Sequence, residues 1–347
     1  MLLFLLGLVL VFHLEAKAEG KQQRNLTILV YMCGSNLESN YSSASLDLQE
    51  MKESGVGSEK VSFLVLAGGA KRWAAGYDPE ELTLVEIQNG KSRNVRTEIS
   101  RSMGDPQTLH AFINYAQANY PADQYALIFW DHGSGPLEGV CFDDLYRPDR
   151  LSVREITEVL RDFFSDNKLK WIGFDACLMG TAEVAAQLAP YAEYMIASEE
   201  REPCYGWDYS FLHDIEKDTS FSETAKRCID LYVSQDLTDV MTLSCIDLSQ
   251  ITEFVASIDK SFETVSRNIN AETFSDISQQ RKTILSYGSD VSKGKLDHDL
   301  VDLDQLVHNT PGLDNEAVSL IESWIRQTVI YRNSNIDTDS GISIYFR

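Results

Sequence analysis

The sequence predicts an α/β protein in which helices flank a mostly parallel sheet, with additions in the second half of the chain. Short apolar runs alternate with segments of helical periodicity, which implies parallel strands joined by right-handed crossovers. Two of the apolar runs end directly in reactive side chains. The run 125–130 leads into Asp131-His132-Gly133, and the run 171–174 leads into Asp175-Ala176-Cys177.

The first half of the chain predicts three strands and two helices. Apolar runs at 25–32 and 61–67 predict strands, and Leu46 and Met51 suggest a helix between them. Asp105-Pro106 places a capping residue and a first-turn proline at the start of the next helix. That helix carries apolar residues at i, i+3, i+4 and i+7, namely Leu109, Phe112, Ile113 and Ala116. The strand that ends at Trp130 follows.

The second half continues the alternation and then adds further elements. A capping box from Ser152 to Glu155 opens a helix, and a small-residue helix that ends at Pro190 follows the strand 171–174. The remaining segments are predicted as strands at 194–197, 240–246 and 341–346 and as helices at 251–262 and 316–331. The sequence shows neither a repeat nor a low-complexity linker, so residues 19–347 are predicted to form a single domain. The chain stops on its last predicted strand, which leaves open that it is a fragment.

The N-terminus has the pattern of a targeting segment. Met1 to Val11 is almost wholly apolar, and Ala16-Lys17-Ala18 fits a small-x-small cleavage site before Glu19. The apolar run is too short for a membrane-spanning helix, which needs roughly 20 residues. A positive charge at the start is missing, which departs from the usual signal pattern. We therefore predict that residues 1–18 are a signal peptide and that the protein is secreted or periplasmic, without a membrane span.

Composition narrows the classes of partner. Of the 347 residues 44% are apolar, enough for a large core. A formal net charge of −23 disfavours nucleic acid as a partner, because phosphate binding needs clustered Lys and Arg. The acidity suits cationic substrates, and it suits solubility alone equally well. None of the six cysteines forms a C-x-x-C pair, so a zinc or redox motif is not expected.

The two reactive blocks point to nucleophilic catalysis. The carboxyl ends of strands in open α/β sheets are where ligands bind, so His132 and Cys177 could meet across one cleft. An imidazole can take the thiol proton and hand it to the leaving amine. We place Cys177 at a helix N-terminus, which would favour its thiolate. The N–H groups of Gly133 and Cys177 are the candidate oxyanion hole. A lone Cys is most often a core residue and a lone His a loop residue, but the pair favours a Cys–His hydrolase.

The blocks Asp131–Gly135 and Asp175–Gly180 also resemble those of the clostripain family of cysteine peptidases, in the larger group that includes caspases, legumains and gingipains. The resemblance covers most of residues 25–347. Weaker segments that share it are 30–32 with 36–38, 197–200, 206–209, 301–303 and 341–345. The resemblance implies a caspase-like fold, with His132 as general base and Cys177 as nucleophile.

The resemblance further implies polypeptide substrates cut after Arg or Lys. In the family the acid two residues before the Cys is associated with the basic-residue pocket, and Asp175 occupies that position here. Glu199, Glu200 and Asp208 could assist it. The alternative for these three acids is a solvated face. The alternative for Asp175 is a cap of the following helix.

Family members are often made as inactive precursors and cut after a basic residue between the two blocks. Arg147 and Arg150 are the candidates. Arg147 precedes Pro148, and a bond followed by proline is a poor cleavage site because proline has a fixed ring and no N–H. We therefore predict self-cleavage at Arg150–Leu151. Some members depend on calcium, and the acids Asp143, Asp144 and Asp149 lie in the same loop. No EF-hand spacing is present, so we predict no cofactor and leave calcium open.

Two other classes of function remain open at this point. One is an exported binding module that keeps the fold and has lost activity. The other is an acyl transferase that uses the same Cys–His pair on an amine acceptor.

Overall fold

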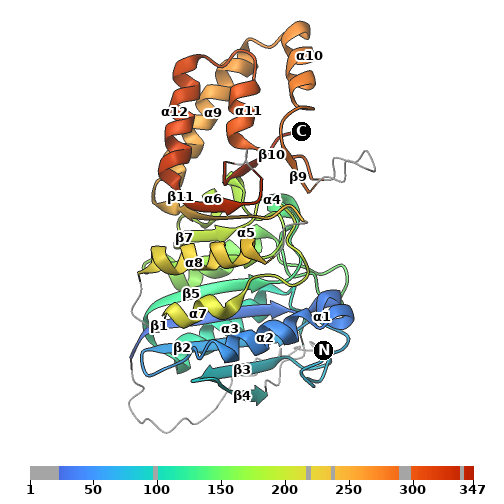
Figure 1. The fold of residues 1–347 in the computed structure, drawn as a ribbon, viewed down its shortest axis with the longest axis vertical. Helices are drawn as coiled ribbons and strands as arrows, with labels where there is room; N and C mark the ends of the chain where they lie inside the picture. The colour runs from blue at the N-terminus through green and yellow to red at the C-terminus, as the bar shows by residue number, and fades with distance from the viewer. Residues whose placement is uncertain (1–22, 97–100, 216–219, 236–238, 289–297, 337–339) are drawn as a thin grey trace, which may run out of the picture.

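The computed structural model describes residues 23–96, 101–215, 220–235, 239–288, 298–336 and 340–347 (Figure 1). The predicted signal peptide at 1–18 lies outside these residues. A nine-stranded sheet runs through the molecule in the order β11-β8-β7-β6-β5-β1-β2-β3-β4. Its five central strands are parallel: β1 (Arg24–Cys33), β2 (Val61–Gly68), β5 (Ala122–Trp130), β6 (Leu169–Asp175) and β7 (Ala192–Ala197). The predicted α/β class with a mostly parallel central sheet is confirmed.

Antiparallel strands extend both edges of this sheet. On one edge lies the hairpin of β3 (Thr83–Gln88) and β4 (Lys91–Arg96), which the sequence analysis did not find. On the other lie β8 (Thr242–Asp247) and β11 (Val329–Ser334). The prediction of a helix through residue 331 is wrong at its end. Helix α12 stops at Thr328, because the β-branched residues that follow pair with β8.

Both faces of the sheet are covered by helices, so the central strands are buried over most of their length and at their carboxyl ends. In β1, Leu29 packs in the core beneath one set of helices and Ile28 in the core beneath the other, as period-two alternation requires. The helices of this part are α1 (Ser35–Tyr41), α2 (Ser43–Glu53), α3 (Pro106–Asn119), α4 (Gly135–Glu138), α5 (Val153–Phe164), α6 (Ala182–Leu188), α7 (Leu212–Ile215) and α8 (Phe221–Ser234). Two short 3₁₀ turns, η1 (Tyr209–Phe211) and η2 (Leu248–Gln250), complete it.

The second half of the chain carries the predicted elaboration. Helices α9 (Ile251–Arg267), α10 (Ala271–Gln280), α11 (Leu303–Asn309) and α12 (Asn315–Thr328) stand together at the upper end of Figure 1. A small sheet of β9 (Ser286–Tyr287), β10 (Leu300–Asp302) and β12 (Ser343–Tyr345) lies beneath them. Among the described residues no helix has the length and apolar character needed to cross a bilayer.

Candidate active site

The two reactive blocks leave the sheet side by side. β5 and β6 are neighbours with Trp130 opposite Asp175, and the Asp131 N–H donates to the Asp175 carbonyl at 3.2 Å. Gly133 fits between the two exits because it has no side chain. A Cβ atom there would lie 2.2 Å from the carbonyl oxygen of Cys177. The structure therefore brings the His132 and Cys177 segments together, as the strand-end rule predicts.

Backbone groups surround the sulfur of Cys177, which is a free thiol. The Glu202 N–H donates to Sγ at 3.2 Å, and Sγ lies 3.7 Å from the Glu202 carbonyl oxygen. Burial raises the pKa of Cys177, while the N–H groups of Glu202, Gly133 and Cys177 itself and the charge of Arg201 lower it. Cys177 is thus a thiol whose ionised form has hydrogen-bond donors in place.

The prediction that Cys177 begins a helix is wrong. α6 begins at Ala182, with Thr181 as its N-cap, so Cys177 lies on the preceding turn, in which Leu178 has a φ of 66°. This turn is held by other parts of the fold. Gly180 donates its N–H to the Ser198 carbonyl at 2.7 Å and accepts the Ser343 N–H at 2.9 Å. The thiolate is therefore favoured by individual N–H groups rather than by a helix terminus.

Asn36 orients the imidazole of His132. Its side-chain oxygen lies 2.7 Å from Nε2 of His132. With this oxygen as acceptor, Nε2 carries the proton and Nδ1 is left to accept one. Burial lowers the pKa of His132, Arg147 lowers it further, and Asp144 opposes them. His132 is thus neutral near neutral pH, the state that a general base requires.

Sequence reasoning missed Asn36. It stands at the exit of β1, the strand beside β5 in the sheet, so its block follows the same strand-end rule as the two reactive blocks. A polar side chain just after a buried strand was the available signal, because the carboxyl ends of neighbouring parallel strands share one edge.

Asp131 braces the surroundings of His132. Its buried Oδ2 accepts the Phe142 N–H at 2.6 Å, and the side chains of Ser35 and Cys33 lie near enough to affect its pKa. Burial raises the pKa of Asp131 to about 8, against the lowering effect of these donors. Asp131 therefore ties the exit of β1 to the segment that follows His132.

Asp175 lies at the end of β6 with donors on both oxygens. Tyr209 donates its hydroxyl to Oδ2 at 2.8 Å, and the Trp207 N–H donates to Oδ1 at 3.2 Å. Burial raises the pKa of Asp175 to about 6. Thr181 caps the following helix, so the alternative role of Asp175 as that cap is wrong.

The other three acids predicted for substrate binding have structural surroundings of their own. Glu199 is fully buried. Glu200 accepts the N–H groups of Arg201 and Gly288, each at 2.8 Å. Asp208 caps η1 through the Ser210 N–H at 2.9 Å. A solvated face, the alternative considered for them, does not describe Glu199. Glu202, in the same acidic segment, also interacts with Asp175, and it was not predicted from the sequence.

The bond predicted for self-cleavage is not in an open loop. Leu151 is buried, and its N–H and C=O both pair with Val140, at 2.8 and 2.9 Å. The Arg150 guanidinium pairs with the Glu138 carboxylate and donates to the Glu138 carbonyl at 2.9 Å. Cleavage at this bond requires the pairing with Val140 to open.

The acids considered for calcium mostly have other partners. Asp143 accepts the N–H groups of Met103, Leu145 and Tyr146, and Asp144 pairs with Lys71 and Arg147. In the described part of the chain, a group with ligand atoms close enough for a metal is found on α11 and α12. Its members are Asp304, His308 and Glu322. They are at least partly exposed, and Glu322 already pairs with Arg326 at 3.6 Å.

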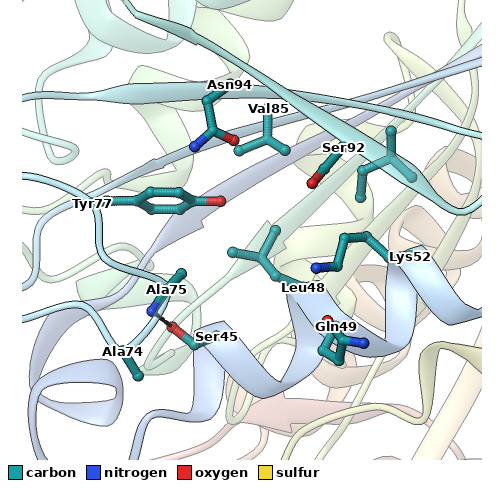
Figure 2. Close-up of a pocket in the computed structure, with 11 residues that line it drawn as sticks. Ser45, Leu48, Gln49, Lys52, Ala74, Ala75, Tyr77, Val85, Ser92 and Asn94 are labelled. Carbon is teal, nitrogen blue, oxygen red and sulfur yellow. Dashed lines mark hydrogen bonds between the residues drawn. The ribbon is translucent and has the colours of Figure 1, made fainter.

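A separate hollow lies between α2 and the edge hairpin, with a volume of about 330 Å³. Figure 2 shows polar and apolar side chains around this hollow. The polar ones include Lys52, Tyr77, Ser92 and Asn94, and the apolar ones include Leu48 and Val85. Neither His132 nor Cys177 lines it, so this hollow is not the reactive centre.

Residues 30–345 match the family model of the clostripain family of peptidases. The chain belongs to the clostripain family. Clostripain of Hathewaya histolytica is 31% identical over 239 residues, which cover 59% of this chain and 44% of that protein. The chain thus spans less than half the length of this curated relative. Within the family it is classed as a cysteine peptidase.

Solved structures share the fold of this clostripain-family chain. An inactive zymogen of a C11 protease from Parabacteroides distasonis has a TM-score of 0.71 at 20% identity, over 93% of this chain and 92% of that one. A secreted C11 cysteine protease from Bacteroides thetaiotaomicron has a TM-score of 0.72 at 18% identity, over 93% of each chain. At these identities the likeness establishes the fold alone.

Proposed function

We propose that this chain is an endopeptidase that cleaves after Arg or Lys, with Cys177 as nucleophile and His132 as base and acid. The observation that carries the proposal is the pairing of the two strand exits, which packs Gly133 against the backbone of Cys177. A single arrangement thus supplies the nucleophile, a neutral base and two donors for an oxyanion.

The proposed reaction follows from the protonation states of Cys177 and His132 before substrate binds. The pKa of Cys177 is raised and that of His132 is lowered, so the pair starts as thiol and imidazole. His132 accepts the thiol proton as the sulfur attacks the scissile carbonyl. The N–H groups of Gly133 and Cys177 hold the oxyanion. The imidazolium then protonates the leaving amine, and water releases the acyl group from Cys177.

Asp175 is the residue proposed to bind the basic side chain of the substrate. It is a buried carboxylate in the segment that leads to the nucleophile. A guanidinium can make two parallel hydrogen bonds to one carboxylate, which favours Arg over Lys. Glu199, Glu200 and Asp208 stay predictions as assisting acids: Glu199 is buried, and the other two accept the backbone N–H groups described above.

The deciding experiment is a panel of fluorogenic peptides that differ only in the residue before the scissile bond. Cleavage confined to the Arg and Lys members is the expected result, and a preference for Asp or Asn would refute it. An amine acceptor added to the same reactions separates hydrolysis from acyl transfer. No turnover with any member would favour the binding module.

We further propose secretion after removal of residues 1–18, activation by self-cleavage between the two blocks, and activity without a bound metal. The exposed Arg147 and the paired Arg150 are the candidate cut sites, and N-terminal sequencing of the processed chain distinguishes them. A new N-terminus at Leu151, absent from Cys177→Ala, is expected. Dialysis against a chelator tests the metal, and full activity afterwards is expected.

A further inference from the structure

Glu202 lies beside both the nucleophile and Asp175. Its backbone N–H and C=O flank the sulfur of Cys177, at 3.2 and 3.7 Å. Its side chain lies close enough to Asp175 for each carboxyl group to affect the pKa of the other, and Trp207 donates an N–H to each group. Glu202 thus lies between the nucleophile and the residue proposed to bind the substrate's basic side chain.

The pair of Glu202 and Asp175 needs a shared proton. Burial and the repulsion between two neighbouring carboxylates favour a state in which one of them carries a proton before a cation binds. The surroundings leave that proton with Glu202. Asp175 receives the Tyr209 hydroxyl and the Trp207 N–H, whereas Glu202 receives one long contact of 3.4 Å from the Trp207 indole N–H. The buried Oε2 of Glu202 receives no N–H or O–H donor among the described residues.

No basic side chain in the described residues forms an ion pair with either acid. The titratable groups that face the pair come from α2, the nucleophile turn, η1 and α8. They are Asp47, Glu50, Cys177, Tyr209, Cys228 and Tyr232. None of these groups is a cation. Arg201, next to Glu202, directs a guanidinium N–H to the Gly288 carbonyl instead. Within the described residues, the site therefore has acceptors for a cation and no basic side chain shown paired with them.

We propose that Glu202 is a second specificity-determining residue, whose proton leaves when a substrate guanidinium or ammonium group binds between it and Asp175. This rests on the proposed preference for Arg or Lys. One proton passes from Glu202 to the solvent, and one cationic side chain takes its place between two carboxylates. The charge of the site thus stays constant, which avoids leaving two adjacent carboxylates without a counter-ion.

Binding of a basic peptide should release a proton from Glu202, and calorimetry can count the protons released. Cys177→Ala protein is titrated calorimetrically with a peptide ending in Arg, in two buffers of different ionisation enthalpy at about pH 7. Binding is expected to release about one proton per site, and close to none when Glu202→Gln is added. The amide keeps the size and the hydrogen-bond donor of the protonated acid but has no proton to lose.

Glu183→Gln in the Cys177→Ala background is the matched control. Glu183, on α6, is another glutamate whose pKa is raised by burial and whose buried Oε2 lacks a donor in the described residues, but it accepts the backbone N–H of Tyr345 in β12. Its amide should leave the proton count unchanged. An equal proton release with and without Glu202→Gln would overturn the role of Glu202.

The outcomes also separate this inference from the proposed function. If a peptide ending in Ala binds as tightly as one ending in Arg, the basic preference itself fails. If the Arg peptide binds selectively without releasing a proton, the preference stands and the inference fails. Should Glu202→Gln not fold, the pH dependence of KM in the unaltered enzyme decides. KM for an Arg substrate should fall as pH rises toward neutrality, and a flat KM contradicts the proposal.

Discussion

The exits of β5 and β6 contain similar residues and use them differently. Each has a buried aspartate followed by a reactive side chain: Asp131 before His132, and Asp175 ahead of Cys177. Asp131 accepts the Phe142 N–H of the scaffold, and the donors near it lower its pKa against the effect of burial. Asp175 has a second acid, Glu202, as a neighbour. A carboxyl group held by a backbone donor of the scaffold orders the fold, whereas one beside a second acid can bind a cationic ligand in the proposed reaction.

Cys177→Ala should remove essentially all peptidase activity and leave the fold intact, because the β6 exit supplies the only nucleophile in the proposed reaction. Turnover of an Arg peptide and circular dichroism measure the two properties. Cys204→Ala is the matched control, since Cys204 is an exposed free thiol in the segment that also carries Glu202. Inactivation by iodoacetamide through labelling of another cysteine would show that the nucleophile is misassigned.

His132→Ala should lower kcat by roughly 10²–10⁴-fold, the usual size of general acid–base catalysis. The substitution removes the proposed base at the end of β5 and leaves Asp175 in place, so binding of an Arg peptide should persist. His110, His213 and His308 serve as controls, and their substitution by Ala should be tolerated. Turnover near the unaltered level in His132→Ala would exclude the proposed dyad.

Asp175→Asn should reduce kcat/KM for Arg peptides by about 100-fold, which corresponds to roughly 3 kcal/mol for a lost charged hydrogen bond. The rate at which iodoacetamide labels Cys177 should change little, because the change affects recognition. Measuring both quantities on the same protein separates the two roles. If labelling falls as much as cleavage, Asp175 acts on the nucleophile instead.

Asn36→Ala should lower kcat by about tenfold with little change in KM, as expected for one hydrogen bond worth roughly 1 kcal/mol. Asn36→Asp gives a sharper signature. A carboxylate beside Nε2 should raise the pKa of His132 and move the acid limb of the kcat/KM profile to higher pH. An unchanged profile in Asn36→Asp would mean that Asn36 does not position the imidazole.

Asp131→Asn should change the pH dependence of stability more than activity. The folded state raises the pKa of Asp131 to about 8, so it binds a proton that the unfolded chain loses near pH 4. This contribution to stability is complete below about pH 4 and is lost as pH rises to about 8. Melting temperatures of Asp131→Asn across that range should fall less than those of the unaltered protein. Parallel curves would show that Asp131 stays ionised.

The sequence predicted the buried strands and the two strand exits, because alternation and strand ends are local patterns. It did not predict Glu202 as the neighbour of Asp175, since that contact joins residues from two separate segments. The placement of Cys177 on a turn was missed for the same reason. Gly180 is held by Ser198 and Ser343, and neither is close to it in sequence. The pairing of Leu151 with Val140 likewise depends on tertiary structure that a polar loop pattern does not reveal.

The attachment of β12 behind the nucleophile turn has a consequence for the order of events during synthesis. Ser343 donates its N–H to Gly180 at 2.9 Å, and Tyr345 donates to the Glu183 carboxylate at 2.9 Å. These bonds join positions 163 and 162 residues apart. They are available only to a chain translated through Tyr345. The turn that presents Cys177 thus receives this support only after residue 345 has been synthesised.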